Sequence, residues 1–211
     1  GSQNSSINSI RDLPFKIILR IMGKGKILVT GGTGYIGSHT VVELCNAGYE
    51  PIIIDNLSNS NINVLDGIKA ITGHPVTYEN IDCKDYNSLE RFLEKHSEIV
   101  AIAHFAASKS VGESVNNPLL YYRNNILSLI NLLQLMAKFN IKNIVFSSSC
   151  TVYGQADVLP VTEQSPIKPA TSPYGSTKQM SETILQDAAF ANKDLNAILL
   201  RYFNPIGAHP S

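Results

Sequence analysis

The sequence lacks an excess of charge of either sign, because its 211 residues hold 17 lysines and arginines and 17 aspartates and glutamates. Charged residues make up only 16 % of the chain, below the usual value of about 25 %. A neutral chain has no basic surface with which to collect nucleic-acid phosphates. It also lacks any apolar run of the roughly 18 residues that a membrane-spanning helix needs. The composition therefore predicts neither a nucleic-acid-binding protein nor a membrane protein.

Cysteine is scarce as well, since the chain contains only Cys45, Cys83 and Cys150. Their odd number and wide spacing fit neither a disulfide framework nor a metal-binding pattern, so we expect reduced thiols in a cytoplasmic protein. The five histidines form no HxxxH pair and no cluster with cysteine, from which we predict no metal site. We interpret His104, which ends an apolar run, as a buried core histidine, and Cys150 as a packing residue rather than a nucleophile.

The apolar fraction of 44 % is sufficient for a sizeable core, and the length fits one large domain or one domain plus part of a second. Gly1 and Ser2 resemble the remnant of a cleaved tag. The apolar stretch 14–22 contains two basic residues and is followed by no small-residue cleavage site, so we expect no signal peptide. We assign residues 1–23 to a tag or irregular N-terminal extension and residues 24–211 to one folded domain.

From Lys26 onward, short β-branched runs alternate with longer segments of helical periodicity. Most of the short runs are continuously apolar, which is typical of strands buried on both faces of a parallel sheet. The sequence predicts strands at 26–30, 51–55, 76–80, 99–105, 143–148 and 196–202, and helices at 35–48, 61–72, 86–97, 118–140 and 173–192. This order predicts an α/β fold with a doubly wound parallel sheet, a Rossmann-like domain. The long irregular stretch 149–172 is expected to be a functional loop.

A glycine-rich segment, Thr30-Gly-Gly-Thr-Gly-Tyr-Ile-Gly37, follows the first predicted strand directly and opens the first predicted helix. Glycines there allow a tight turn and a close approach of a pyrophosphate to the helix N-terminus. Asp55 ends the second predicted strand, where a carboxylate accepts hydrogen bonds from an adenosine ribose and repels the 2′-phosphate of NADP. The pattern predicts a dinucleotide site that prefers NAD, with a purely structural turn as the alternative.

A second group of polar residues combines the serines of 147–149, at a predicted strand end, with Tyr174 and Lys178 at the start of the last helix. Tyr174 and Lys178 are spaced i, i+4 and therefore lie on one helical face. A phenol is a poor base at neutral pH, but a neighbouring ammonium and a nicotinium ring would lower its pKa. Ser149 could hydrogen-bond the same substrate oxygen. YxxxK also occurs by chance on solvated helices, yet its place after the fifth strand of a dinucleotide fold favours a catalytic role.

Taken together, these motifs resemble the extended short-chain dehydrogenase/reductases, and within them the UDP-glucose 4-epimerase (UDP-galactose 4-epimerase) family. The resemblance runs from Lys26 to the last residue without a gap in motif order. The similar stretches are TGGTGYIGSHT (30–40), DNLSNS (55–60), HFAA (104–107), KSVGES (109–114), SSSCTVYG (147–154), SPYGSTK (172–178) and LRYFNPIGAHP (200–210). The resemblance implies NAD as the cofactor and a role in galactose and nucleotide-sugar metabolism.

The resemblance also implies roles for individual residues. The cofactor would contact Gly31, Gly34, Tyr35, Ile36 and Gly37 at its pyrophosphate, and Asp55, Asn56, Asn59, Ser60, Asp82 and Cys83 at its adenosine. Its nicotinamide half would contact Phe105, Ala106, Ala107, Lys109, Asn124, Ser149, Tyr174, Lys178 and Phe203. Catalysis would depend on Ser149, Tyr174 and Lys178, and the UDP-sugar would contact Lys109, Ser149, Thr151, Tyr174 and Asn204.

The implied reaction is the NAD-dependent epimerisation of a UDP-hexose at C4, through a transient 4-ketose and without net oxidation. Related 4,6-dehydratases carry an acidic residue soon after the serine run, whereas residues 150–153 here are Cys-Thr-Val-Tyr, which disfavours a dehydratase. A dehydrogenase, a reductase, and an epimerase of another UDP-sugar such as an N-acetylhexosamine stay open as alternatives. In the resembling enzymes, helices 118–140 and 173–192 pack against a second subunit, so we expect a homodimer.

The resembling family continues past the N-P-I-G-A-H-P motif into a smaller domain that closes over the UDP-sugar. Because this chain ends at Ser211, we expect a nearly complete cofactor site and little or no turnover. A cofactor-binding module without activity is therefore the alternative to an active epimerase.

Overall fold

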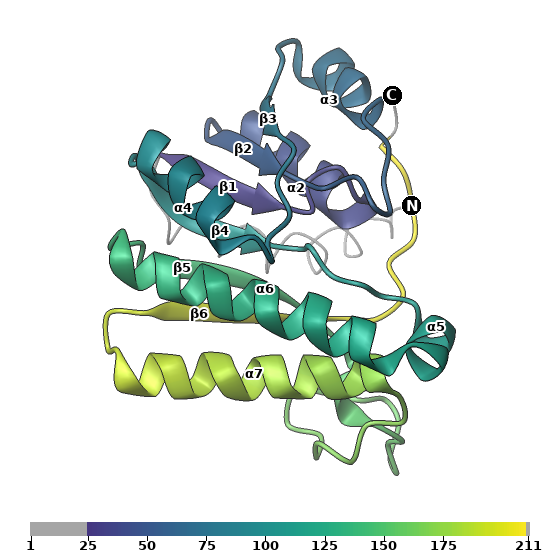
Figure 1. The fold of residues 1–211 in the computed structure, drawn as a ribbon. Helices are drawn as coiled ribbons and strands as arrows, with labels where there is room; N and C mark the ends of the chain where they lie inside the picture. The colour runs from purple at the N-terminus through teal and green to yellow at the C-terminus, as the bar shows by residue number, and fades with distance from the viewer. Residues whose placement is uncertain (1–24, 210–211) are drawn as a thin grey trace, which may run out of the picture.

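The computed structural model describes residues 25–209 as a parallel β-sheet with helices on both of its faces (Figure 1). The extension expected at residues 1–23 lies outside the described residues. The strands are β1 (Lys26–Thr30), β2 (Glu50–Ile54), β3 (Thr77–Glu79), β4 (Ile99–His104), β5 (Asn143–Ser149) and β6 (Asn196–Tyr202). The helices are α2 (Tyr35–Asn46), α3 (Val64–Thr72), α4 (Tyr86–Lys95), α5 (Val111–Asn116), α6 (Pro118–Lys138) and α7 (Pro173–Ala191), with a short 3₁₀ helix η1 (Cys150–Tyr153).

All the strands and helices that the sequence predicts are present, with ends that differ by three residues or fewer. Two short helices, α5 and η1, are not among the predicted elements. Both begin at a serine whose side chain accepts a hydrogen bond from the backbone of the new helix: Ser110 from Glu113, and Ser149 from Thr151. These local caps start helices that are too short to show a hydrophobic period.

The six strands lie in the order β3-β2-β1-β4-β5-β6, and every neighbouring pair is parallel. The chain therefore builds one half of the sheet outward from β1, returns beside β1 with β4, and builds the other half in the opposite direction. This is the doubly wound, Rossmann-like sheet that the sequence predicts. In such sheets, ligands bind at the carboxyl ends of the strands, at the point where the strand order reverses. Here that point lies between β1 and β4.

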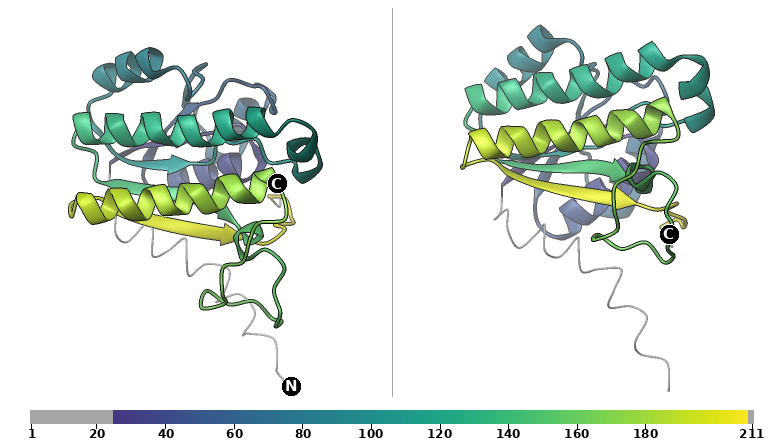
Figure 2. Two further views of the ribbon diagram at one scale, coloured as in Figure 1. Left: turned by 60° about the horizontal axis from the view of Figure 1, so that its bottom comes forward. Right: turned by 90° about the horizontal axis from the view of Figure 1, so that it is seen from below.

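The core has two layers because successive side chains of a strand point to opposite faces of the sheet. Leu28 of β1 packs in a cluster with buried residues of α4, α6 and α7, while its neighbours Ile27 and Val29 pack in a second cluster with α2 and α3. All three side chains are at most 1 % exposed. Figure 2 shows α6 and α7 running side by side over the first of these faces. Buried apolar residues on both faces explain why the strands read as continuous apolar runs.

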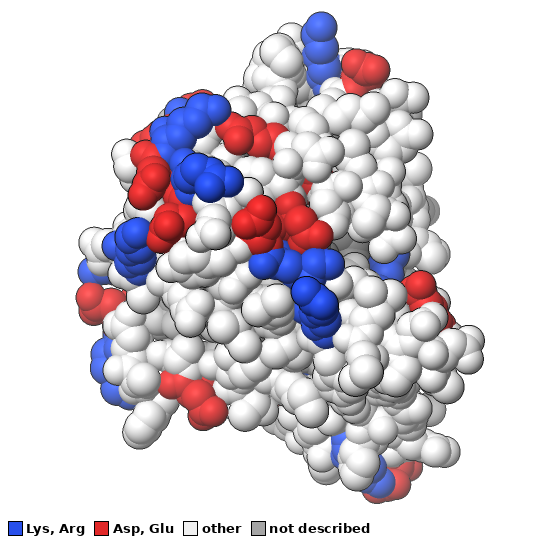
Figure 3. Space-filling model, viewed as in Figure 1, with Lys and Arg blue, Asp and Glu red and all other residues white. Residues whose placement is uncertain are grey.

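On the face seen in Figure 3, positive and negative side chains are intermixed rather than gathered in patches of one sign. Within residues 25–209, no helix combines the length and apolar character needed to cross a membrane. The same part of the chain contains no group of three or more potential metal ligands. All three cysteines are free.

Candidate active site

A cavity of about 490 Å³ lies at the carboxyl ends of the strands. Its walls come from the glycine-rich loop after β1, the segments that follow β2, β3 and β4, the side of α6, the ends of β5 and β6, and the first turns of α7. Every residue that the family resemblance assigns to cofactor binding, substrate binding or catalysis lines this cavity. Other lining residues include Ile54, Ser58, Ile81, Lys84, Ser108, Val111, Ser128, Ser147, Ser148, Cys150, Tyr202 and Pro205.

The glycine-rich loop is shaped so tightly that side chains would not fit in it. Gly31 has a φ of +68°, and a Cβ atom there would lie 2.6 Å from the backbone nitrogen of Ala106. At Gly37, on the first turn of α2, a Cβ atom would lie 2.2 Å from the carbonyl oxygen of Gly31. Helix α2 begins at Tyr35, its N-cap residue Gly34 provides no side-chain hydrogen bond, and its first turn contains no acidic residue. The helix N-terminus therefore forms a cradle for an anionic group such as a pyrophosphate.

Asp55 follows β2 and ties the adjacent loop to the glycine-rich segment. Its carboxylate accepts hydrogen bonds from the backbone of Leu57 at 2.9 Å, from the hydroxyl of Ser60 at 3.2 Å and from the backbone of Thr33 at 3.3 Å. A carboxylate has about four lone-pair sites, so these three contacts leave capacity for a ligand hydroxyl. The position fits the ribose contact that the sequence predicts.

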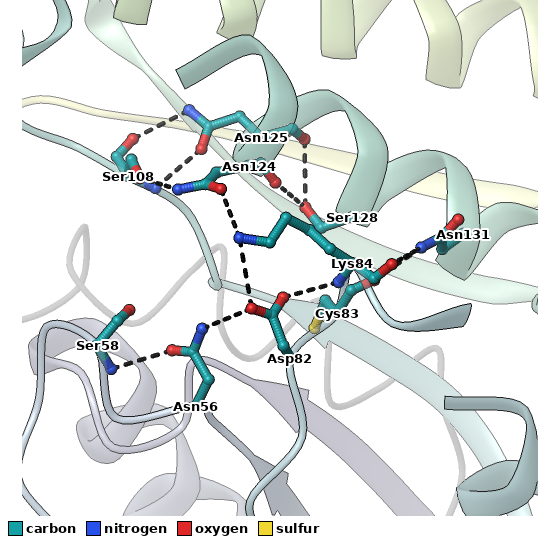
Figure 4. Close-up of polar contacts among 10 residues, drawn as sticks. All are labelled: Asn56, Ser58, Asp82, Cys83, Lys84, Ser108, Asn124, Asn125, Ser128 and Asn131. Atoms are coloured by element: carbon teal, nitrogen blue, oxygen red, sulfur yellow. Dashed lines mark hydrogen bonds and ion pairs between the residues drawn. The ribbon is translucent and has the colours of Figure 1, made fainter. Parts of the chain in front are cut away.

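Asn56, which follows Asp55, and Asp82, in the segment after β3, both line the cavity and contact each other (Figure 4). The amide of Asn56 donates to the carboxylate of Asp82 at 3.0 Å, and the backbone of Lys84 donates to the same carboxylate at 2.9 Å. Burial raises the pKa of Asp82, but these two hydrogen bonds and the Lys84 ammonium outweigh it, so that the net effect is a lowered pKa. Asp82 is therefore a stable anion at neutral pH.

The segment after β4 is held in place by a buried asparagine. The side chain of Asn125, 3 % exposed, accepts a hydrogen bond from the backbone of Ser108 at 2.8 Å and donates to the Ser108 carbonyl at 3.0 Å. Its amide also donates to the hydroxyl of Thr177 on α7 at 3.0 Å. Asn125 thereby fixes the segment that carries Ala107 and Lys109 against the helix that carries Tyr174 and Lys178.

Lys178 is buried beneath the cavity, with only 3 % of its surface exposed. Its ammonium donates to the carbonyl of Ser147 at 2.6 Å and lies 4.7 Å from the centre of the Phe146 ring. Burial lowers the pKa of Lys178 to about 8, against the opposing attraction of Glu182. The amine is therefore mostly protonated at pH 7 and loses its proton as the pH rises through about 8.

Tyr174 lies beside Ser149 as predicted, and in the chain alone its pKa is raised, whereas the predicted lowering also involves a nicotinium ring. Burial raises the pKa of the Tyr174 phenol, a hydrogen bond with Ser149 lowers it, and the nearby Cys150 thiol raises it again, for a net increase. The Lys178 ammonium, which the sequence analysis expects to favour phenolate, is hydrogen-bonded to Ser147 and lies 5.8 Å from the centre of the Tyr174 ring. The residues of the chain alone therefore keep this phenol protonated.

Behind the cavity lies a buried ionic network that the sequence analysis does not identify. The carboxylate of Glu182, 2 % exposed, accepts hydrogen bonds from the Ser148 hydroxyl at 2.5 Å and from two nitrogens of Arg201 at 2.9 and 2.7 Å. A third nitrogen of Arg201 donates to the Tyr153 hydroxyl at 2.9 Å. One signal does exist in the sequence: Glu182 follows Lys178 by four residues and so shares its face of α7.

The end of β6 and the residues after it also contribute to the cavity wall. Tyr202 pairs with Ser149 in the register of β5 and β6, and burial raises the pKa of its phenol to about 12. Phe203 and Asn204 follow it and are exposed at the rim. Thr151 contributes a buried hydroxyl oxygen that has no hydrogen-bond partner within the described residues. An unpaired buried hydroxyl in a cavity wall is suited to a polar ligand.

The expectation for His104 is confirmed. This side chain is 2 % exposed, and its Nδ1 atom lies 2.6 Å from the hydroxyl oxygen of Thr30. Burial, assisted by the charge of Lys178, lowers the pKa of His104 to about 3, so that it stays neutral. The Thr30 hydroxyl also accepts from the backbone of Ala106 at 3.3 Å, which joins the ends of β1 and β4 below the glycine-rich loop.

Comparisons with known proteins agree with this geometry. Residues 27–211 match the NAD dependent epimerase/dehydratase family. The chain is 50 % identical over 186 residues to the UDP-glucose 4-epimerase of Dictyostelium discoideum, and 51 % identical over 185 residues to that of Bacillus subtilis. In both cases the match covers 88 % of this chain and 54 % of the relative.

Solved structures give the same result. The UDP-glucose 4-epimerase of Bifidobacterium longum in complex with NAD⁺ and UDP is similar with a TM-score of 0.85 and 46 % identity, over 87 % of this chain and 55 % of that one. The enzyme of Stenotrophomonas maltophila, with bound NAD and formylated UDP-arabinopyranose, has a TM-score of 0.84 and 45 % identity, over 88 % and 55 % of the two chains. The chain spans about half the length of the relatives it matches.

Proposed function

Since this chain belongs to the NAD-dependent epimerase/dehydratase family, we propose that residues 24–211 are the NAD-binding domain of an enzyme that interconverts UDP-glucose and UDP-galactose. One observation carries the proposal: a single cavity brings together the glycine-rich loop, Asp55 and the group Ser149, Tyr174 and Lys178. The identity of about 50 % to several UDP-glucose 4-epimerases supports the same substrate class.

The residues of the cavity fit a dinucleotide. The cradle at Gly31 and Gly37, which a Cβ atom would fill, would hold the pyrophosphate at the start of α2. Asp55 would accept hydrogen bonds from the adenosine ribose, and its charge would disfavour the 2′-phosphate of NADP. When bound, NAD⁺ would supply a reversible hydride acceptor, so that C4 of the sugar could be oxidised and reduced again without net change.

The chain's own residues would handle the proton of the sugar. We assign to Tyr174 the removal and return of the proton of the 4-hydroxyl group, with Ser149 hydrogen-bonded to the same oxygen. Because burial keeps Tyr174 protonated in the chain alone, its basic form would need further positive charge in the cavity. Lys178 would supply part of that charge from below, where Ser147 holds its ammonium.

Substrate contacts and assembly are further parts of the proposal. Lys109, Thr151 and Asn204 line the cavity and would contact the UDP-sugar. We propose that this chain holds the cofactor and the catalytic group but has little turnover without the part by which its relatives are longer. Helices α6 and α7 would form a homodimer interface, since they expose Leu119 at 80 % and Phe190 at 78 % of their surface.

The proposal is tested by measuring the conversion of UDP-galactose to UDP-glucose without added NAD. Two proteins are compared: this chain, and a chimaera in which the remaining part of the Bacillus subtilis relative follows it. We expect bound NAD in both and turnover in the chimaera alone. Tyr174→Phe should reduce turnover of the chimaera to a few per cent, whereas Tyr122→Phe, on α6 and outside the cavity lining, should not.

Each other outcome has a distinct meaning. Bound NAD without turnover in the chimaera would contradict the substrate assignment, and UDP-N-acetylhexosamines would be the next substrates to test. Absence of bound NAD from both proteins, even after incubation with the cofactor, would contradict the cofactor assignment itself.

A further inference from the structure

The sequence motifs assign no role to Lys84, yet it lines the cavity, and its ammonium lies between Asp82 and Asn124 (Figure 4). It donates to the side-chain oxygen of Asn124 at 2.6 Å and forms an ion pair with Asp82 at 3.4 Å. Asp82 belongs to the segment after β3, on the proposed adenosine side. Asn124 belongs to α6 and lines the proposed nicotinamide side. Lys84 is therefore a direct link between side chains assigned to opposite ends of the dinucleotide.

The position of Lys84 is fixed from several directions. Asn131, which lies two turns after Asn124 on α6, donates its amide to the carbonyls of Cys83 and Lys84 at 3.1 and 3.0 Å. The backbone N–H of Lys84 donates to the Asp82 carboxylate at 2.9 Å. The side chain of Lys84 is 29 % exposed. Because its backbone is fixed at both ends, the lysine loses less conformational freedom when its ammonium is held in one place.

The contacts continue beyond both partners of Lys84. On one side, Asp82 accepts from the amide of Asn56, at 3.0 Å, in the segment after β2. On the other side, the amide nitrogen of Asn124 donates to the hydroxyl of Ser108, at 2.9 Å, in the segment after β4. The path thus runs through residues that line the cavity, from the segment after β2 to the segment after β4, with Lys84 as its central cation.

The hydrogen-bonding capacity of Lys84 fixes which way the side-chain amide of Asn124 is oriented. An ammonium can only donate hydrogen bonds, whereas the asparagine amide has one accepting and one donating end. Lys84 therefore turns the oxygen of Asn124 toward itself and leaves the nitrogen facing Ser108. Without the ammonium, the amide could rotate by half a turn, and Asp82 would lose its nearest positive charge.

We propose that Lys84 is a positioning residue, which holds Asn124 and Asp82 in the orientations that receive the two ends of NAD. The inference rests on the proposed function, because it takes the cavity to be a dinucleotide site. Lys84 would thus couple the two halves of the site without taking part in the chemistry.

The test is the affinity of this chain for NAD and for AMP, measured by isothermal titration calorimetry after removal of endogenous nucleotide. Lys84→Met should weaken NAD binding about tenfold, and AMP binding by less, because AMP does not reach Asn124. Lys84→Arg keeps a donor cation and should stay within about threefold of the unmodified chain. The control is Lys95→Met, which breaks the ion pair with Glu79 at 2.6 Å outside the cavity lining and should change neither affinity.

A double-mutant cycle adds a second readout. Adding Asn124→Ala to Lys84→Met should cost little further NAD affinity, since both changes break the same link.

Equal NAD affinity of Lys84→Met and the unmodified chain would overturn the inference while leaving the proposed function intact. A loss that Lys84→Arg does not restore, accompanied by a lower melting temperature than that of Lys95→Met, would also overturn it, because the role would then be structural. Failure of the unmodified chain to bind NAD would instead overturn the proposed function, and this inference with it.

Discussion

The carboxylate of Glu182 accepts hydrogen bonds from two nitrogens of Arg201, at 2.9 and 2.7 Å, and Glu182 is only 2 % exposed. The pair joins α7 to β6 directly behind the cavity. One turn earlier on the same helix, Lys178 carries the buried ammonium of the catalytic group, and the charge of Glu182 raises its pKa against the effect of burial. Glu182 thus both joins α7 to β6 and raises the pKa of the Lys178 ammonium.

Breaking the Glu182–Arg201 pair should strongly reduce the stability of the folded chain. We expect Arg201→Met to lower the free energy of unfolding by about 3–5 kcal/mol, because it leaves the Glu182 carboxylate buried without its cation. The control is Asp194→Asn, which breaks the exposed pair of Asp194 and Lys142 at 2.9 Å. That change should cost less than about 1 kcal/mol. Urea unfolding at pH 7 measures both, and similar losses would contradict the prediction.

The buried Lys178 should make stability depend on pH. Its pKa is about 8 in the folded chain, against 10.5 for a lysine exposed to solvent, so the unfolded chain binds more protons between these limits. Stability should therefore rise with pH from about 8 to 10.5 through this group, by up to about 3 kcal/mol at about 1.4 kcal/mol per pKa unit. Lys178→Met should lack this rise. Parallel pH profiles of the free energy of unfolding for the two proteins would disprove the assignment.

A methyl group at Gly37 should disturb the glycine-rich loop. In Gly37→Ala the new Cβ atom would lie 2.2 Å from the Gly31 carbonyl oxygen, so the loop must shift. We expect a loss of about 1–3 kcal/mol in unfolding free energy and loss of NAD binding. Gly67→Ala, on α3, places its Cβ atom in open space and should instead stabilise the chain by up to about 1 kcal/mol. Thermal melts and calorimetry distinguish the two variants.

Asp55 should set the preference between NAD and NADP. We expect Asp55→Asn to weaken NAD binding about tenfold or more, because a hydrogen bond to a charged group contributes about 1.5–3 kcal/mol. NADP binding should weaken less or improve, because the repulsion of the 2′-phosphate is removed. Asp66→Asn, at an exposed carboxylate on α3, is the control. An unchanged ratio of the two affinities would exclude this role for Asp55.

The proposed homodimer is tested at the exposed apolar residues of α6 and α7. We expect the unmodified chain to sediment as a dimer, and Leu119→Asp together with Phe190→Asp to give monomers. Val158→Asp changes a residue that is similarly exposed, at 74 %, but lies in the loop before α7. This variant should stay dimeric. A monomer at all concentrations of the unmodified chain would remove the dimer proposal.

The parts of the fold that the sequence predicts are those with a local signal. Apolar runs mark the strands, and the glycine-rich segment marks the first turn between strand and helix. Helix α5 is not predicted, although Ser110 and Glu113 form the S-x-x-E pattern of a capping box. Its six residues are too few for a hydrophobic period, so only the cap could have revealed it.

The site is predictable where residues follow strands directly, since the carboxyl ends of parallel strands meet at one edge. Lys84 and Arg201 are different because their roles depend on partners from distant parts of the chain. Arg201 lies opposite Ser148 only through the register of β5 and β6, and Lys84 meets Asn124 only because α6 covers that edge of the sheet. Burial also raises the pKa of Tyr174 in the chain alone, and the sequence does not reveal this effect because the burial of this phenol is a property of the folded chain.

Because translation proceeds from the N-terminus, β1 and the glycine-rich loop are synthesised before most of the residues that line the cavity. The glycine-rich loop is synthesised early, yet the backbone of Ala106 lies so close to Gly31 that it leaves no room for a Cβ atom, and residues as late as Pro205 line the cavity. A nascent chain would therefore display the phosphate loop long before it could retain a nucleotide. Retention of the cofactor by the complete cavity would therefore require that translation has passed β6.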